Sequence, residues 1–136
     1  MITTYRLALI GFGTVGRGLA EILRDKGDTL AQHYGARFVI TAVSTAGRGC
    51  VSDPHGIAPA LLLGAAGTQS GLRSLPFACD WDALRVIEEA QADIVVETTW
   101  TNLEDAEPAT TYLRRALQRG LHVVTRQQGA DCASLP

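Results

Sequence analysis

The stretch Gly11-Phe12-Gly13-Thr14-Val15-Gly16 decides the fold of this chain. It lies between the apolar run Leu7–Ile10 and a segment with the apolar spacing of a helix, Leu19–Leu23. A strand, a glycine turn and a helix in this order are typical of a dinucleotide-binding βαβ unit. The sequence therefore predicts a nucleotide site close to the start of the chain.

Each glycine of this turn has its own expected task. Gly11 permits the tight turn, Gly13 lets the backbone approach a pyrophosphate, and Gly16 lets the helix pack closely on the strand. The unpaired N–H groups and the dipole at the start of the helix would then meet the phosphates. We expect all six residues of the turn to form the phosphate site.

Composition limits the classes of partner. The chain has 136 residues, an apolar content of 46% and a formal charge of −2, which fit one folded domain or a piece of a larger chain. Its Lys and Arg residues are scattered, so we expect no nucleic acid partner and no membrane. The sequence shows no span of about 20 apolar residues and no leader, and the cytoplasm is the expected compartment.

The cysteines and histidines predict no metal site. Cys50, Cys79 and Cys132 are far apart in the sequence and lack the close pairing of a structural zinc site. The three histidines are equally isolated. We interpret the cysteines as reduced thiols and the histidines as surface or packing residues.

Strands alternate with helices along the rest of the chain. After a first helix from Thr14 to about Lys26, strands are expected at Arg37–Ser44, Asp93–Glu97 and Leu121–Thr125. This alternation predicts an α/β fold, a Rossmann-type doubly wound parallel sheet in three αβα layers.

The connecting segments complete this prediction. Residues 45–75 are rich in Gly, Ser and Pro and predict a long excursion with a short helix at Pro59–Leu63. Asp80 is the expected N-cap of the next helix. A helix from about Asp105 to Arg119 should end at Gly120, with Tyr112, Leu113, Ala116 and Leu117 facing inward.

Ligands of open α/β sheets lie beyond the carboxyl ends of the strands. At the end of the second strand, the acid that usually meets a free ribose 2′-hydroxyl is missing, and the chain reads Ser44-Thr45-Ala46-Gly47-Arg48. Hydroxyls and a guanidinium suit a 2′-phosphate better, since Arg can bind it with two charge-assisted hydrogen bonds. Ser44 and Arg48 are therefore candidate cofactor residues; the alternative for Arg48 is a solvated loop arginine.

Short polar side chains follow the strand that ends at Glu97. Thr98, Thr99, Thr101 and Asn102 would lie where a nicotinamide and its ribose bind, or would form a turn and cap the next helix. Thr98 and Thr99 are taken as cofactor-binding candidates. Glu97 is interpreted as a hydrogen-bonded structural acid.

Three segments together resemble the amino-terminal domain of homoserine dehydrogenases. They are the glycine turn, the loop Ser52-Asp53-Pro54-His55-Gly56, and the run from Asp93 to Asn102, which contains Thr-Thr-Trp-Thr-Asn. Glu107-Pro108-Ala109 and the segment Leu117–Thr125 are similar to the same family. The resemblance covers nearly the whole chain up to Thr125.

The resemblance implies an oxidoreductase activity. Such enzymes interconvert L-homoserine and aspartate semialdehyde by hydride transfer with NAD or NADP, in threonine and methionine biosynthesis. It also implies that Phe12 to Val15 line the pyrophosphate site and that Thr99 approaches the nicotinamide ribose. The missing acid and Arg48 slightly favour NADP over NAD.

The sequence departs from the family at Arg126. The family continues with Ala-Asn-Lys-Gly-Pro, whereas this chain continues with Arg126-Gln127-Gln128-Gly129-Ala130. Plausible codons for Arg126–Cys132, shifted by one base, encode the family motif, so we hypothesise a frameshift. The expected organisation is an NAD(P)-binding domain at residues 1–125 followed by an atypical, out-of-frame tail at 126–136; sequencing the coding DNA tests it.

No catalytic residue is assigned, because the family's substrate-binding domain and its proton-donating lysine are not in this sequence. We expect a cofactor domain that is inactive by itself and that could form a homodimer. The alternative is a nucleotide-binding regulatory module without catalysis. Another amino-acid or semialdehyde dehydrogenase is disfavoured by the Thr-Thr-Trp-Thr-Asn segment.

Overall fold

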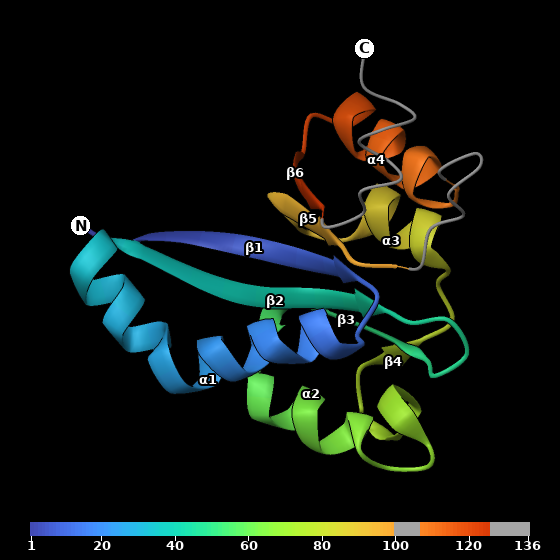
Figure 1. Ribbon diagram of the computed structural model, residues 1–136, viewed down its shortest axis with the longest axis horizontal. Coiled ribbons are helices and arrows are strands. Elements are labelled where there is room, and N and C mark those ends of the chain that lie inside the picture. Colours follow the sequence, from blue (N-terminus) through green and yellow to red (C-terminus); the bar gives the residue numbers. More distant parts are fainter. Residues whose placement is uncertain (100–106, 126–136) are drawn as a thin grey trace.

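A six-stranded sheet forms the centre of the molecule, with strand order β4-β3-β2-β1-β5-β6 (Figure 1). The computed structural model describes residues 1–99 and 107–125. The elements in chain order are β1 (Thr3–Ile10), α1 (Thr14–Tyr34), β2 (Ala36–Ser44), β3 (Cys50–Ile57), α2 (Pro59–Ala66), the 3-10 helix η1 (Gly71–Ser74), β4 (Ala78–Cys79), α3 (Ala83–Glu89), β5 (Ile94–Glu97), α4 (Ala109–Gln118) and β6 (His122–Thr125). The expected tail at 126–136 lies outside the described residues.

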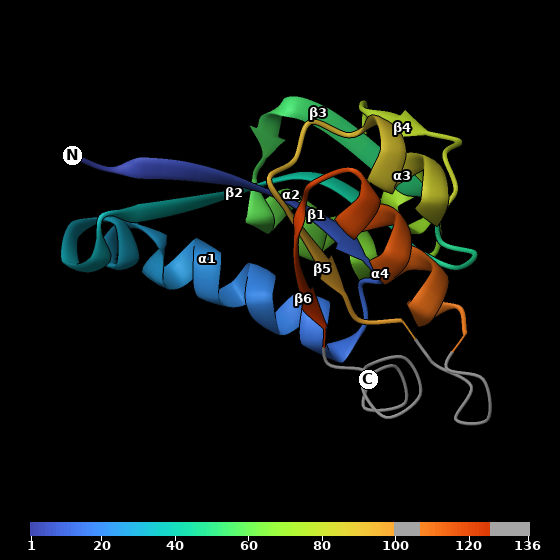
Figure 2. The same ribbon diagram turned by 90° about the horizontal axis from the view of Figure 1, so that it is seen from above.

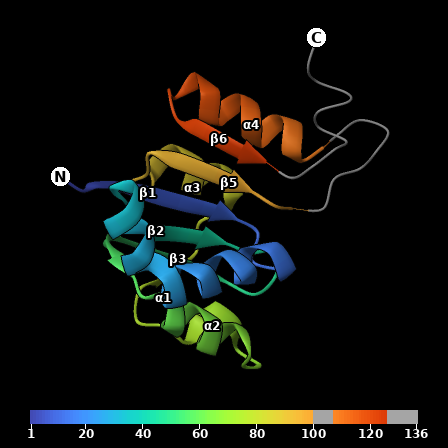
Figure 3. The ribbon, with the colours of Figure 1, turned by 60° about the vertical axis from the view of Figure 1, so that its left-hand side comes forward.

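Helices cover both faces of the sheet, as Figures 1 and 3 show. Side chains alternate along β1, so that Leu7 and Leu9 face α1 and α2, whereas Ala8 and Ile10 face α3 and α4. Each face has its own buried apolar cluster. This arrangement confirms the predicted Rossmann-type fold in three αβα layers. Among the described residues, no helix is both long enough and apolar enough to cross a bilayer.

The sheet is mixed, so the predicted parallel sheet is extended at one edge by antiparallel strands. Strands β2, β1, β5 and β6 are parallel, but β3 and β4 add antiparallel pairs at one edge. Strand β3 was missed because it contains Ser52-Asp53-Pro54-His55-Gly56, residue types that favour turns. Pro and Gly are tolerated near an edge, where ladder hydrogen bonds can be omitted.

Helix α1 extends to Tyr34, well beyond the expected end near Lys26. Gly27 and Asp28 lie inside it, and Gly35, in the left-handed region with φ 67°, ends it. The second half is stabilised by packing, since Ala31 is buried and Asp28 forms an ion pair with Arg37 of β2. Figure 2 shows this half of the helix running beside the start of β1 and β2. Tertiary contacts therefore override the local helix-breaking signal.

The later helices differ from the prediction in detail. The N-cap of α3 is Asp82, not Asp80, because the Asp82 carboxylate accepts from the Arg85 N–H at 2.8 Å. Helix α4 is described from Ala109, and the expected start at Asp105 falls outside the described residues. Its inward face carries Ala109 and Ala116, whereas Leu117 is 64% exposed, so the expected inner stripe is wrong at this position.

Arg6, in the middle of β1, and Asp93, just before β5, connect these two strands with the start of β6. The Asp93 carboxylate accepts from the Arg6 backbone N–H at 2.8 Å and from its Nη2 at 3.2 Å. The Asp93 N–H donates to the Arg6 carbonyl, and the His122 N–H donates to the Asp93 carbonyl. The hydrogen bonds from the Arg6 side chain, then from its backbone, lower the pKa of Asp93.

We expect Asp93→Asn to cost about 1 kcal/mol at neutral pH, a small value because both side chains stay partly exposed. Since the pKa of Asp93 is lower in the folded chain, its contribution is present above the unfolded pKa of about 4 and is lost as the pH falls through the folded pKa. Urea unfolding at about pH 7 and pH 3 measures this. If the free energies of unfolding of wild type and variant differed as much at about pH 3 as at about pH 7, this prediction would be wrong.

Candidate functional site

The glycine turn meets the carboxyl ends of β2 and β5. The Gly11 N–H donates to the Ser44 carbonyl at 2.8 Å, and the Thr98 N–H donates to the Ile10 carbonyl at 2.9 Å. Three of the segments expected at the site are therefore brought together at one rim of the sheet, the rim where open α/β folds bind their ligands.

The three glycines of the turn differ in their surroundings. Gly11 has φ +100°, and a Cβ there would lie 2.7 Å from the Thr98 Oγ1. A Cβ on Gly16 would lie 3.1 Å from the Gly11 carbonyl oxygen, so the helix packs tightly under the turn. A Cβ on Gly13 would meet no atom of the described chain within 4 Å. The space in front of Gly13 is thus open to a ligand.

The N-terminus of α1 is suited to an anion. Gly13 is its N-cap, no side chain of the described chain caps it, and no acidic residue lies in its first turn. The first N–H groups of any helix lack acceptors within the helix. Here they face the open position at Gly13, and the helix dipole favours a negative charge there.

A cavity of about 230 Å³ adjoins this helix end. It is lined by Phe12, Gly13, Arg17, Thr45, Ala46, Arg48, Ala66 and Leu72. These side chains include two arginines and no acid, so the cavity is electropositive. It reaches from the glycine turn to the loop between β2 and β3.

Arg48 is anchored at the wall of this cavity. Its Nη2 donates to the carbonyls of Ala66 and Thr68 at the end of α2. Within the described part of the chain, its Nε and Nη1 make no hydrogen bond, so a guanidinium with five N–H donors keeps donors for a ligand. Its role at the cofactor stays a prediction.

Arg17 is a cavity residue that the sequence reasoning missed. It lies in the first turns of α1, and its N–H donates to the Gly13 carbonyl at 2.9 Å. The spacing of four residues from Gly13 was the available signal, because residues four apart share one face of a helix.

Three predicted cofactor residues, Ser44, Val15 and Thr14, do not line this cavity. Ser44 is 5% exposed, and its neighbour Thr45, not Ser44 itself, lines the cavity. The Thr45 Oγ1 donates to the Gly49 carbonyl at 2.6 Å and so shapes the loop. Val15 is 44% exposed and faces an apolar groove formed by α1 with β1, β5 and β6. Thr14 is exposed in the first turn of α1.

Hydrogen bonds at the carboxyl end of β5 fix the positions of Thr98 and Thr99. The Thr98 Oγ1 donates to the Ile10 carbonyl at 3.2 Å. The backbone N–H and the Oγ1 of Thr99 both donate to Glu97 Oε2, at 2.9 and 3.0 Å. Glu97 is fully buried and positions the turn after β5, which agrees with its interpretation as a structural acid. The predicted contacts of Thr101 and Asn102 lie outside the described residues.

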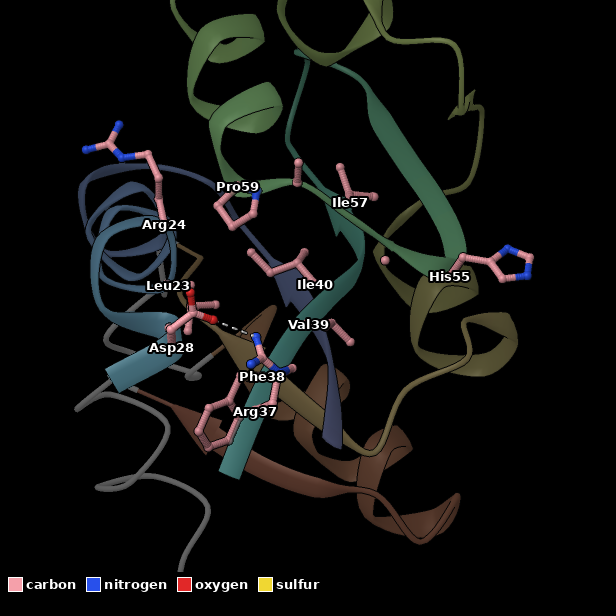
Figure 4. Close-up of a pocket in the computed structure, with 13 residues that line it drawn as sticks. Leu23, Arg24, Asp28, Arg37, Phe38, Val39, Ile40, His55, Ile57 and Pro59 are labelled. Atoms are coloured by element: carbon pink, nitrogen blue, oxygen red, sulfur yellow. Dashed lines mark hydrogen bonds and ion pairs between the residues drawn. The ribbon is translucent and has the colours of Figure 1, made fainter. Parts of the chain in front are cut away.

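A second cavity, of about 290 Å³, lies on the opposite rim, between α1, β2, β3 and the start of α2 (Figure 4). Its Arg37 is already paired with Asp28 at 3.2 Å. Figure 4 shows Arg24 and His55 pointing away from it. This cavity lies away from the carboxyl ends of the parallel strands, where ligands of open α/β folds bind. The described residues also contain no group of three side chains placed to hold a metal ion.

Comparison with known proteins agrees with this geometry. Residues 11–133 match the family model described as homoserine dehydrogenase, NAD binding domain. The chain belongs to this family. It is 38% identical to an NAD(+)-dependent homoserine dehydrogenase of Pseudomonas canavaninivorans over 130 residues, which are 94% of this chain and 37% of that protein. It is 32% identical to a homoserine dehydrogenase of Methanocaldococcus jannaschii, with 90% and 36% covered.

Solved structures of homoserine dehydrogenases share the fold. A hyperthermophilic archaeal homoserine dehydrogenase in complex with NADPH aligns with a TM-score of 0.74 at 21% identity, covering 94% of this chain and 37% of that one. The enzyme of Thermoplasma acidophilum aligns with a TM-score of 0.74 at 19% identity, covering 97% and 38%. The chain thus spans a little over a third of the length of each of these four relatives.

Proposed function

We propose that this NAD-binding domain binds the pyrophosphate of a nicotinamide dinucleotide at the N-terminus of α1. The observation that carries the proposal is the open, uncapped helix end at Gly13 beside an electropositive cavity. The adenosine half would occupy the cavity. The nicotinamide half would lie toward Thr98 and Thr99, at the end of β5.

We also propose that the domain prefers NADP(H). Among its relatives, one is described as NAD(+)-dependent and one neighbour is a complex with NADPH, so the preference has to come from this chain's own residues. Arg17 and Arg48 both line the cavity, and among the described residues no acidic side chain does. An arginine pair suits a 2′-phosphate, whereas a carboxylate would suit a free 2′-hydroxyl.

Titration with NADPH and NADH, followed by protein fluorescence, tests both proposals. We expect saturable binding of both, with NADPH tighter, and we expect Arg48→Gln to weaken NADPH by about tenfold with little effect on NADH, since it loses about one charge-assisted pair. Arg73→Gln is the matched control, because Arg73 donates to the Gly47 carbonyl on the same loop but does not line the cavity. Equal losses for the two cofactors would contradict the phosphate role.

In the whole reaction, we propose that this domain supplies the cofactor half of a homoserine dehydrogenase. Hydride transfer requires the nicotinamide and the alcohol carbon to be held in contact, and this chain covers 37% of its relative's length. We therefore expect cofactor binding without turnover from the chain alone. The homodimer and the cytoplasmic location expected from the sequence stay predictions.

A further inference from the structure

Two cysteine side chains meet at the edge of the sheet next to the cofactor cavity. Cys50 begins β3 and Cys79 ends β4, and their Cα atoms are directly paired across these antiparallel strands. The Sγ atoms lie 3.0 Å apart. Both are free thiols. Their separation of 29 positions hides this pairing in the sequence.

The backbone geometry suits a covalent bond between them. Residues directly opposite in antiparallel strands have Cα atoms about 4.5 to 5.5 Å apart, within the range of about 4.4 to 6.8 Å that disulfides span. The sulfurs need to approach by about 1 Å to reach a bond length of about 2 Å. No rearrangement of the strands is required.

We propose that Cys50 and Cys79 form a thiol–disulfide modification site, which a low-molecular-weight disulfide oxidises to an intramolecular bond between β3 and β4. Cys79 is partly exposed, whereas Cys50 is 3% exposed, so the reagent reaches Cys79 first. The order of the two steps follows from this difference.

The exchange is balanced. The Cys79 thiolate attacks one sulfur of the small disulfide, which forms a mixed disulfide and releases one small thiol. The Cys50 thiolate then attacks the Cys79 sulfur, which forms the Cys50–Cys79 bond and releases the second small thiol. Both protein thiols are oxidised, the small disulfide is reduced to two thiols, and the two protons go to the released thiolates.

Burial, and then its neighbour Cys79, raise the pKa of the Cys50 thiol. Because only the thiolate attacks, this slows the second step and makes it faster as the pH rises. Cys50 is thus the resolving thiol.

The bond would fix one wall of the cofactor cavity. Arg48 lies just before Cys50, while Ala66 and Leu72 lie between the two cysteines. The wall segments already contact each other, since the Leu72 N–H donates to the Arg48 carbonyl at 3.0 Å. A cross-link between Cys50 and Cys79 reduces the conformational freedom of these wall segments. This preorganisation should tighten NADPH binding by about threefold. This step rests on the proposed cofactor function.

The first test is independent of any cofactor. A Cys132→Ser variant keeps the pair and removes the third cysteine. After incubation with oxidised glutathione, the mass of this variant should fall by two hydrogen atoms, and both free thiols of the pair should disappear. Dithiothreitol should restore them. The oxidised form should melt on the order of 10 °C higher than the reduced form. Cys79→Ser in the same background is the control and should gain no cross-link.

A glutathione adduct that persists on Cys79 without closing, or a bond between protein molecules, would overturn the proposal. The second test compares the NADPH dissociation constants of the oxidised and reduced forms. A closed disulfide with unchanged affinity would overturn the coupling to the cavity and leave the modification site. Absence of NADPH binding in both forms would count against the proposed cofactor function only.

Discussion

Gly13→Val is expected to abolish NADPH binding while the chain stays folded. The pyrophosphate must approach the backbone at Gly13 to reach the N–H groups of α1, and a branched side chain would occupy that space. The NAD-binding domain itself has room for the new side chain, because a Cβ there meets no described atom within 4 Å and the φ of Gly13 is −92°. We expect affinity to fall on the order of 100-fold, about 3 kcal/mol.

The measurement is a fluorescence titration of wild type and variant, with circular dichroism and thermal unfolding to show that both are folded. Gly18→Val is the matched control, because Gly18 lies on the same helix and its Cβ position is equally open. It should bind NADPH as wild type does. Retained affinity in a folded Gly13→Val chain would mean that the phosphates bind elsewhere.

The parts of the site that the sequence predicted are those that depend on local geometry. The glycine turn could be recognised because the backbone requirement at each glycine is set by residues nearby in the sequence. Examples are the positive φ of Gly11 and the close helix contact at Gly16. The strands β1, β2 and β5 could be recognised because both faces of the sheet are covered and each strand contains a largely apolar run, such as Leu7–Ile10 of β1.

The parts that escaped prediction depend on partners far away in the sequence. Strand β3 forms despite Asp53, Pro54 and Gly56 because β2 and β4 pair with it. Arg17 lines the cavity because the loop after β2 folds beside α1. Cys50 and Cys79, interpreted separately as ordinary thiols, meet only through the strand register. Sequence patterns report local preference, and these features arise from tertiary pairing.

Gly11→Ala is expected to destabilise the fold strongly. The new side chain would sit at φ +100°, a conformation that L residues rarely adopt, and its Cβ would lie 2.7 Å from the Thr98 Oγ1. Backbone strain of about 1 to 3 kcal/mol adds to the cost of displacing Thr98. We expect a total near 4 kcal/mol, a large part of the roughly 5 to 15 kcal/mol that stabilises a typical domain. Urea unfolding of variant and wild type measures it.

Two companion variants separate the strain from the collision. Gly47 also has a positive φ, +86°, but a Cβ there meets no described atom within 4 Å, so Gly47→Ala should show the strain alone. Thr98→Ala removes the Oγ1 that the new Cβ would strike. In the double variant Gly11→Ala, Thr98→Ala, the loss should be smaller than the sum of the two single losses, because contacting residues are not additive. An additive result would show that Thr98 is not what the Gly11 side chain meets, and the turn would then lie differently against the end of β5.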